Sequence, residues 1–349
     1  MKIFASDLKY LAAYTIPVMA LTGIVFQGIY SFVVPLVAFG LIPLMELMLP
    51  ASDKNFDEIT ENKRIHIRFF DFLLYLNVPL LYSILFFYFR YLESSPVWNA
   101  EFIGITFTVG ICCGVMGINV AHELGHRSSA FERVLAKSLL VTSMYLHFII
   151  EHNRGHHRNV STPLDPASAD FNENLYKFWF RSITGSIQSA WHLEKIKLER
   201  ADKPVWSYHN EMLQFVFLQI AYFALVWGIF GIQALAGAFV VAFIGILLLE
   251  TVNYVEHYGL RRKEIEPGIY EKVKPTHSWN SDHALGRILL YELTRHSDHH
   301  YKAQRPYQIL RHFHQSPQLP TGYPGCMLLA LIPPLWFRVM NPRISALNP

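Results

Sequence analysis

The stretch "FIGITFTVGICCGVMGINVAHELGHR", residues 102–127, joins a long apolar run to two histidines. Residues 102–124 are long enough to cross a bilayer as a helix, which takes about 20 mostly apolar residues. His122 and His126 lie four positions apart and therefore share one face of that helix. The stretch predicts a membrane-spanning helix that carries imidazole groups at one end.

The composition of the whole chain fits a membrane protein. Of its 349 residues, 52% are hydrophobic and 16% are charged, whereas soluble domains usually have about 25% charged residues. The net charge of +3 gives no argument for nucleic acid as a partner. Cys112, Cys113 and Cys326 form no C-x-x-C pair, so we expect three buried apolar residues rather than disulfides or metal ligands.

Six apolar segments have the length of a membrane span. They lie near residues 10–29, 32–50, 70–92, 102–124, 212–230 and 233–255. The expected fold is an all-α integral membrane protein with about six transmembrane helices, forming one domain over residues 1–349. Two shorter apolar segments, 134–150 and 325–337, are predicted to lie at the membrane interface.

The distribution of lysines and arginines predicts how the chain is oriented in the membrane. With six spans and a cytoplasmic N-terminus, the cytoplasmic segments are 1–9, 51–69, 125–211 and 256–349. These segments hold every lysine and arginine except Arg90, as expected from the excess of positive charge in cytoplasmic loops. Residues 125–211 and 256–349 are therefore predicted to form a cytoplasmic helical cap.

Nine of the 17 histidines gather at or just beyond the cytoplasmic ends of the predicted spans. They stand in "HELGH", "EHNRGHH", "VEH" and "RHSDHH" and are His122, His126, His152, His156, His157, His257, His296, His299 and His300. Imidazole suits iron, copper, zinc and nickel, but one zinc usually takes four ligands. Two octahedral ions could share nine nitrogens and keep positions for oxygen. Iron is the expected metal if the site carries out oxygen chemistry.

Two other metal functions were weighed. "HELGH" matches the H-E-x-x-H motif of zinc peptidases, in which His122 and His126 bind zinc and Glu123 is the general base. That interpretation leaves seven clustered histidines unexplained. A histidine-rich metal transporter would need polar residues along its spans, which here carry few, such as Asp71 and Asn77.

A carboxylate adjoins a histidine in each cluster. Metal-bound histidines usually donate their other ring N–H to a carboxylate or a carbonyl group. The candidates for this orienting role are Glu123, Glu151, Glu256 and Asp298, with Asp165, Asp170 and Asp282 as weaker ones. Because neighbouring helical residues point about 100° apart, each carboxylate is expected to orient a histidine of another cluster; the alternative is a surface ion pair.

The other eight histidines are predicted to lie outside the metal site. His312 and His314 are among them, because alternate residues do not share a helical face.

Five stretches together resemble the integral-membrane alkane 1-monooxygenases, which share histidine boxes with membrane desaturases and hydroxylases. They are "HELGHR", "EHNRGHHRNVSTPLDPASA", "NYVEHYGLRR", "LTRHSDHHYKAQRPYQ" and "LPTGYPGCMLLALIPPLWFRVMNPR". The likeness runs from about residue 100 to the C-terminus. The isolated His257 and the "LPTGYPG" stretch are more specific to alkane hydroxylases than the three general boxes.

The resemblance implies a catalytic di-iron centre, with two non-haem iron ions held by the nine histidines. It implies terminal hydroxylation of medium-chain n-alkanes to 1-alkanols with O2 and two electrons from rubredoxin. Rubredoxin reductase in turn reduces rubredoxin. Since the chain lacks the two C-x-x-C pairs of a fused rubredoxin, the donor is expected to be a separate protein. Basic residues in 158–211 or 258–311 are expected to receive it.

The resemblance also implies a bacterial inner membrane protein with its active site on the cytoplasmic side. A homo-oligomer is an open alternative to a single chain. A methyl hydroxylase of the xylene type and a membrane fatty-acid desaturase or hydroxylase are the alternative activities. A bilayer-dissolved alkane should reach the metal through an apolar channel. The first span and the aromatic-rich third span, 70–92, are expected to wall this channel, whose lining residues the sequence does not identify.

Overall fold

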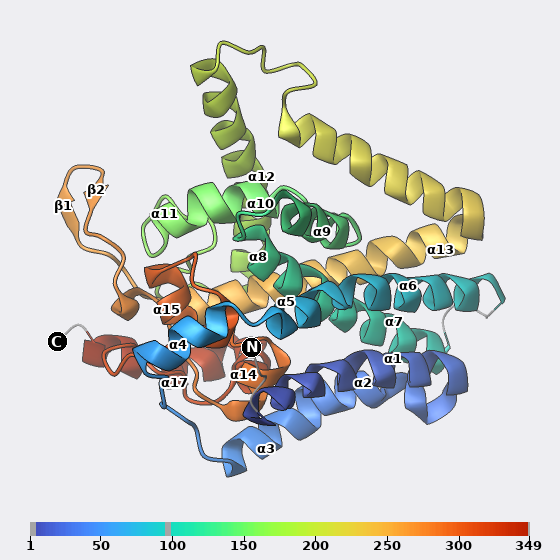
Figure 1. The fold of residues 1–349 in the computed structure, drawn as a ribbon, viewed down its shortest axis with the longest axis horizontal. Coiled ribbons are helices and arrows are strands. Elements are labelled where there is room, and N and C mark those ends of the chain that lie inside the picture. Colours follow the sequence, from blue (N-terminus) through green and yellow to red (C-terminus); the bar gives the residue numbers. More distant parts are fainter. Residues whose placement is uncertain (1–4, 95–98, 348–349) are drawn as a thin grey trace.

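The structure is a computed structural model that describes residues 5–94 and 99–347. This part of the chain is almost entirely helical, apart from a small hairpin of β1 (Glu264–Glu266) and β2 (Ile269–Tyr270). Long helices form a bundle, and shorter helices and loops pack at one end of it (Figure 1). The predicted all-α fold class is confirmed.

Five helical stretches in the described part are long and apolar enough to cross a membrane. They are Ala5–Phe26, Gly28–Met48, Arg68–Ser94, Ala100–Gly125 and Glu211–His257. The named helices within them are α1 (Thr15–Phe26), α2 (Val33–Leu36), α3 (Ile42–Met48), α5 (Arg68–Tyr75), α6 (Asn77–Ser94), α7 (Ala100–Cys112), α8 (Asn119–Gly125) and α13 (Glu211–His257). The side chains of Asn99 and Asn210 accept backbone hydrogen bonds at the beginnings of α7 and α13, which satisfies amide groups that a helix start leaves unpaired.

Helix α13 is bent into two arms at Gly231. This residue has a φ of +83°, a conformation that only glycine adopts readily, and the chain reverses its direction there (Figure 1). The rings of Phe223 and Phe239 stack with their centroids 4.3 Å apart, whereas a straight helix would separate residues at this spacing by about 24 Å. The two arms match the predicted segments 212–230 and 233–255. The number of membrane crossings stays a prediction.

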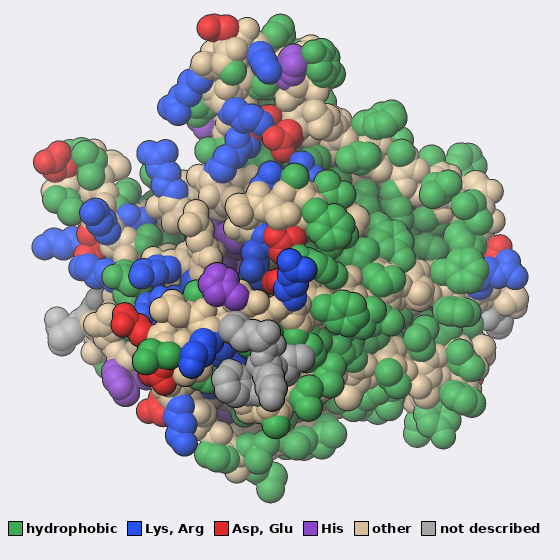
Figure 2. Space-filling view, viewed as in Figure 1, with side chains coloured by type: hydrophobic (Ala, Val, Ile, Leu, Met, Phe, Trp, Pro, Cys, Tyr) green, Lys and Arg blue, Asp and Glu red, His purple; other side chains and the backbone are tan. Residues whose placement is uncertain are grey.

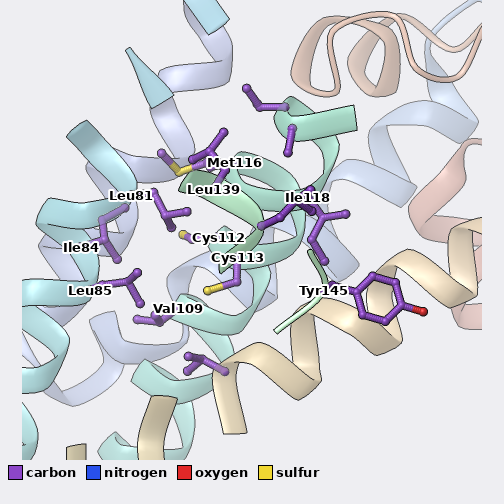
Figure 3. Close-up of a cluster of buried hydrophobic side chains, with 14 of the residues drawn as sticks. Leu81, Ile84, Leu85, Val109, Cys112, Cys113, Met116, Ile118, Leu139 and Tyr145 are labelled. Atoms are coloured by element: carbon purple, nitrogen blue, oxygen red, sulfur yellow. The ribbon is translucent and has the colours of Figure 1, made fainter. Parts of the chain in front are cut away.

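The centre of the bundle is a tightly packed apolar core. Figure 3 shows side chains from α6 and α7, among them Leu81, Leu85 and Val109, together with Cys112 and Cys113. These side chains are at most 2% exposed, and all three cysteines are buried and unpaired, as predicted. Gly110 lets α7 approach α13 closely, because a Cβ atom there would lie 2.5 Å from the side chain of Ile244. Small residues at such crossings are typical of membrane helices.

The surface divides into an apolar and a charged part. Hydrophobic side chains cover most of the visible face over the long helices, whereas charged side chains gather over the short helices, the β hairpin and the end of α12 (Leu175–Arg200) (Figure 2). Large apolar side chains on the long helices are widely exposed, such as Leu47 at 69% and Phe217 at 70%. A surface of this kind is stable only in contact with lipid or a partner. The chain is therefore an integral membrane protein.

The remaining helices form the cap at one end of the bundle. They are α4 (Glu58–Ile65), α9 (Ala130–Val141), α10 (Phe148–Glu151), α11 (His157–Asn159), α12, α14 (Ala284–Leu289), α15 (His296–Tyr301), α16 (Tyr323–Ala330) and α17 (Pro333–Leu347). Segment 134–150, expected to be one interfacial helix, is divided between α9 and α10 by a turn in which Met144 has a φ of +53°. Segment 325–337 is likewise divided, between α16 and α17.

Candidate metal centre

The structure brings together all nine histidines singled out in the sequence and divides them into two groups. The first group is His122, His126, His152, His157 and His299, and the second group is His156, His257, His296 and His300. Within each group the candidate ligand atoms lie within 4.8 Å of one another. Each group therefore has the donors and the size to hold one metal ion.

The short helix α15 contributes to both groups. His296 and His300 lie one helical turn apart and belong to the second group, with their Nε2 atoms 2.9 Å apart. His299 points to the first group, where its Nε2 atom lies 2.9 Å from that of His122. The "RHSDHH" motif thus lies between the two sites.

A π-helical turn at His152–His156 explains how the second histidine box serves both groups. In an α-helix, residues five apart point about 140° away from each other. The wider π turn instead brings the Nε2 atoms of His152 and His157 to within 3.0 Å, while His156 joins the second group. Single π turns of this kind are frequent at functional sites.

The ring nitrogens are spaced as metal ligands would be. The Nε2–Nε2 distances in the first group include 3.0 Å for His152–His126 and 3.1 Å for His299–His157, and that for His296–His257 in the second group is 3.2 Å. With metal–nitrogen bonds of about 2.0–2.1 Å, ligands at right angles are about 2.9 Å apart and tetrahedral ligands about 3.3 Å. The separations lie in the range expected for ligands of one ion, and imidazole suits iron among other metals.

Burial keeps most of these imidazoles in the form that binds a metal. Removal from water lowers the pKa of five of these imidazoles well below the value of a free histidine: His152, His157, His296, His299 and His300. The neighbouring imidazoles lower these pKa values further, by a smaller effect. A neutral imidazole offers a lone pair, whereas a protonated one cannot bind a cation.

Asp165 orients one ligand of the second group. Its Oδ2 atom lies 2.9 Å from Nδ1 of His156, and it also accepts hydrogen bonds from the Ser168 hydroxyl and the Ala167 amide. Burial lowers the pKa of His156, but Asp165, together with Glu151 and Glu256, outweighs this effect and raises the pKa overall. With the proton held at Nδ1, the Nε2 lone pair of His156 is directed at the metal position. The sequence offered Asp165 only as a weaker candidate.

Three of the four preferred carboxylates have hydrogen-bond partners other than histidines in the described part of the chain, and their orienting role stays a prediction. Glu123 accepts hydrogen bonds from Arg127 and the Tyr307 amide, Glu151 from the Ser189 hydroxyl, and Asp298 from Arg311. These carboxylates are buried, so they need donors from arginines and loop groups. They hold segments of the cap around the two groups.

Glu256 does face a histidine of another cluster. Its Oε2 atom lies 3.2 Å from Nε2 of His296, and its Oε1 atom accepts a hydrogen bond from the Tyr323 hydroxyl at 2.6 Å. The contact is made at the candidate ligand nitrogen of His296 and not at Nδ1. Glu256 thus lies beside the second metal position, on the side of the pocket described next.

An apolar pocket reaches both groups. His122 and His152 of the first group and His296 of the second are among the residues that line it. Most of its wall is apolar and includes Ile16, Ala38, Phe39, Ile42, Ile111, Val115, Ile118, Leu248, Leu249, Val252, Leu289, Leu290, Leu293 and Met327. The pocket therefore suits an apolar molecule with one end beside the metal positions.

The expectation that the third span walls the channel is wrong for this pocket, although the first span does contribute. No residue of Arg68–Ser94 in the described chain lines it. Tyr88 and Phe89 are buried in the core instead, and Phe86 and Phe87 are 50% and 45% exposed. The aromatic side chains of this helix thus pack in the bundle or face outward.

Comparison with known proteins decides the family. The pattern of the fatty acid desaturase family matches residues 96–330. Alkane 1-monooxygenase of Ectopseudomonas oleovorans is 41% identical over 318 residues, which cover 91% of this chain and 79% of that protein. The chain belongs to the alkane 1-monooxygenase family. It is therefore a membrane monooxygenase, and the two histidine groups are the part of it suited to hold metal.

Two other proteins are similar over comparable lengths. Alkane 1-monooxygenase 1 of Alcanivorax borkumensis is 41% identical over 307 residues, covering 88% of this chain and 76% of that protein. The xylene/toluene monooxygenase hydroxylase component XylM of Pseudomonas putida is 30% identical over 337 residues, covering 94% and 86%.

Proposed function

We propose that this chain is a di-iron alkane 1-monooxygenase of the bacterial inner membrane, with its active site on the cytoplasmic side. It converts a medium-chain n-alkane, O2, two electrons and two protons to a 1-alkanol and water. The observation that carries this proposal is a single apolar pocket that reaches both histidine groups. An unactivated C–H bond is not attacked by acid–base chemistry; two bound irons would supply the oxidising power.

The chain's own residues position the substrate and exclude water. The apolar walls offer no hydrogen bond to an alkane, so the hydrocarbon is held by contact alone and enters lengthwise. His122, His152 and His296 line the pocket, and in this proposal they form its inner end, where only the terminal carbon comes near the metal positions. Such positioning is a sufficient reason for terminal selectivity.

A product assay tests the proposed function. Purified protein loaded with iron is combined with rubredoxin, rubredoxin reductase, NADH, O2 and octane. We expect 1-octanol that carries one atom from labelled O2, and about two irons per chain. Zinc as the sole metal, or desaturation of an acyl substrate in place of alkane hydroxylation, would overturn the proposal.

A second candidate is the hydroxylation of aromatic methyl groups. The similarity to XylM favours it, and the apolar wall of the pocket accepts either class of substrate. Competition between octane and m-xylene at equal concentration separates the two, because the preferred substrate suppresses the product of the other.

The position of Phe39 predicts a limit on substrate length. This half-buried side chain belongs to the π-helical turn Val37–Leu41 and lines the pocket. Phe39→Ala is expected to lengthen the pocket and to shift the preferred alkane upward by at least two carbons, with a several-fold gain in kcat/KM for the longer chain. The product profile over C6 to C16 alkanes measures the shift. Phe87→Ala, on the third span outside the pocket, is the control; an equal shift there would place the channel elsewhere.

The electron donor is proposed to be a separate rubredoxin that docks beside His157. Arg158 follows this ligand directly and is exposed. Its backbone carbonyl accepts a hydrogen bond from Arg262, whose neighbours Arg261 and Lys263 are exposed and basic. An acidic carrier would meet positive charge close to a candidate ligand of the first group.

Charge reversal at this surface is expected to slow electron transfer. Arg158→Glu combined with Lys263→Glu should lower the rate at which reduced rubredoxin is oxidised by about tenfold at low ionic strength, and by less in high salt. Stopped-flow absorbance of rubredoxin measures the rate. Arg90→Glu is the control, since this exposed arginine is the one lysine or arginine outside the four segments predicted to be cytoplasmic. An unchanged rate in the double variant at low salt would rule out this docking surface.

A further inference from the structure

A third cluster of candidate metal ligands lies on the cap, apart from the two histidine groups. It consists of Asp53, His312 and His314, whose ligand atoms lie within 4.8 Å of one another. The Nε2 atom of His312 is 3.3 Å from Nδ1 of His314. None of the three residues belongs to either histidine group, and none lines the apolar pocket.

His312 and His314 do not lie on a helix, although a helix was the reason to expect them outside a metal site. Residues 310–313 have no helical structure, and Leu310 is extended with a ψ of 138°. Outside a helix, residues two apart are not held about 160° apart around a helix axis. His312 and His314 can therefore meet, although they would be separated on a helix.

Asp282 fixes the tautomer of His312. Its Oδ2 atom lies 2.7 Å from Nδ1 of His312, and the two side chains are 6% and 8% exposed. The buried carboxylate holds the proton on Nδ1 and leaves the Nε2 lone pair directed at His314. Metal-binding histidines usually have this carboxylate partner on the far side of the ring.

The backbone on both sides of the cluster is already held in place. Asn55 donates a hydrogen bond to the carbonyl group of His312 at 2.9 Å and accepts one from its amide at 2.7 Å. The guanidinium group of Arg295 donates to the carbonyl groups of Ser52, Lys54 and Leu310. The candidate ligands thus come from two loops, and Arg295, which directly precedes His296, is hydrogen-bonded to both loops.

The spacing of the nitrogens suits two ligands of one ion. Tetrahedral ligands on bonds of about 2.0–2.1 Å are about 3.3 Å apart, which is the separation of the two ring nitrogens in this cluster. Two imidazoles and one carboxylate form the three-ligand set of an open zinc site, with water as the fourth ligand. Asp53 and His314 are exposed, so solvent reaches the fourth position.

We propose that Asp53, His312 and His314 bind one divalent transition-metal ion, with zinc as the best fit to the donors. The ion ties loop 51–57 to residues 310–314 and so braces Arg295, the first residue of the "RHSDHH" motif. It shares no ligand with the iron centre. The inference does not depend on which substrate is oxidised.

Zinc binding to the iron-loaded protein tests the proposal. The protein carries a purification tag without histidine, is dialysed against dilute zinc chloride alone, and is analysed for zinc and iron in the same sample. We expect the wild type to bind one zinc per chain more than His314→Ala binds, with equal iron in both. Asp53→Asn should weaken zinc binding by about tenfold, whereas His192→Ala, which removes an exposed histidine on α12, should leave it unchanged.

A second measurement separates a built site from loss of folding. Zinc should raise the melting temperature of the wild type and of His192→Ala, but not that of His314→Ala or Asp53→Asn. Equal zinc in the wild type and His314→Ala would overturn the proposal. So would zinc that is taken up only as iron is lost, because that zinc would occupy the iron groups.

Discussion

His299→Ala is expected to abolish hydroxylation and to lower the iron content at the same time. The Nε2 atom of His299 lies 2.9 Å from that of His122 and 3.1 Å from that of His157, so it contributes to the centre of the first group. Alanine removes this donor and leaves a space that only water can fill. Iron per chain and 1-octanol per minute, measured on the same preparation, should fall together, with the activity dropping to background.

His147→Ala is the matched control for this variant. His147 is also a buried histidine in the cap, 8% exposed, but it belongs to neither group. Its loss should leave the iron content near two per chain. If His299→Ala keeps full activity, the first group is not the iron site and the proposed ligand set fails.

Asp165→Asn is expected to weaken iron binding by about 10–100-fold without removing a ligand. The carboxylate accepts the Nδ1 proton of His156 and so directs Nε2 to the second group. Asparagine has the same shape but can donate to Nδ1, which moves the ring proton to Nε2 and blocks the ligand atom. The measured quantity is the iron retained after incubation with a graded series of chelator concentrations.

A surface carboxylate provides the comparison for Asp165. Asp170 forms an ion pair with Arg261 and is 63% exposed, and Asp170→Asn should retain iron as the wild type does. Iron that is held as tightly by Asp165→Asn as by the wild type would show that His156 is oriented by the metal itself.

The sequence predicted the helices well because a membrane span is defined by length and hydropathy alone. The segment expected at 70–92 is found as Arg68–Ser94, and that at 102–124 as Ala100–Gly125. The nine histidines could be selected for a similar reason, since they cluster at the ends of apolar runs. Both features can be predicted without information on which helices are neighbours in the fold.

The details that the sequence missed all depend on tertiary contacts. The π turn at His152–His156 decides which group each histidine joins, and no residue pattern marked it. Asp298 adjoins a histidine in the chain but accepts hydrogen bonds from Arg311, 13 residues further on, and Glu123 accepts one from the amide of Tyr307, 184 residues away. The aromatic side chains of residues 70–92 were visible in the sequence, but the direction in which they point was not.

The shared helix α15 has a consequence for assembly of the enzyme. His299 serves one group and His296 and His300 the other, and the three residues sit on a single helix of six residues. An ion that binds to either group would fix the helix and order the donor atoms of the other group. Binding of the second ion would therefore lose less conformational entropy than binding of the first. Metal uptake is then cooperative. A half-metallated preparation should be a mixture of empty and fully loaded molecules, with few chains that carry a single ion.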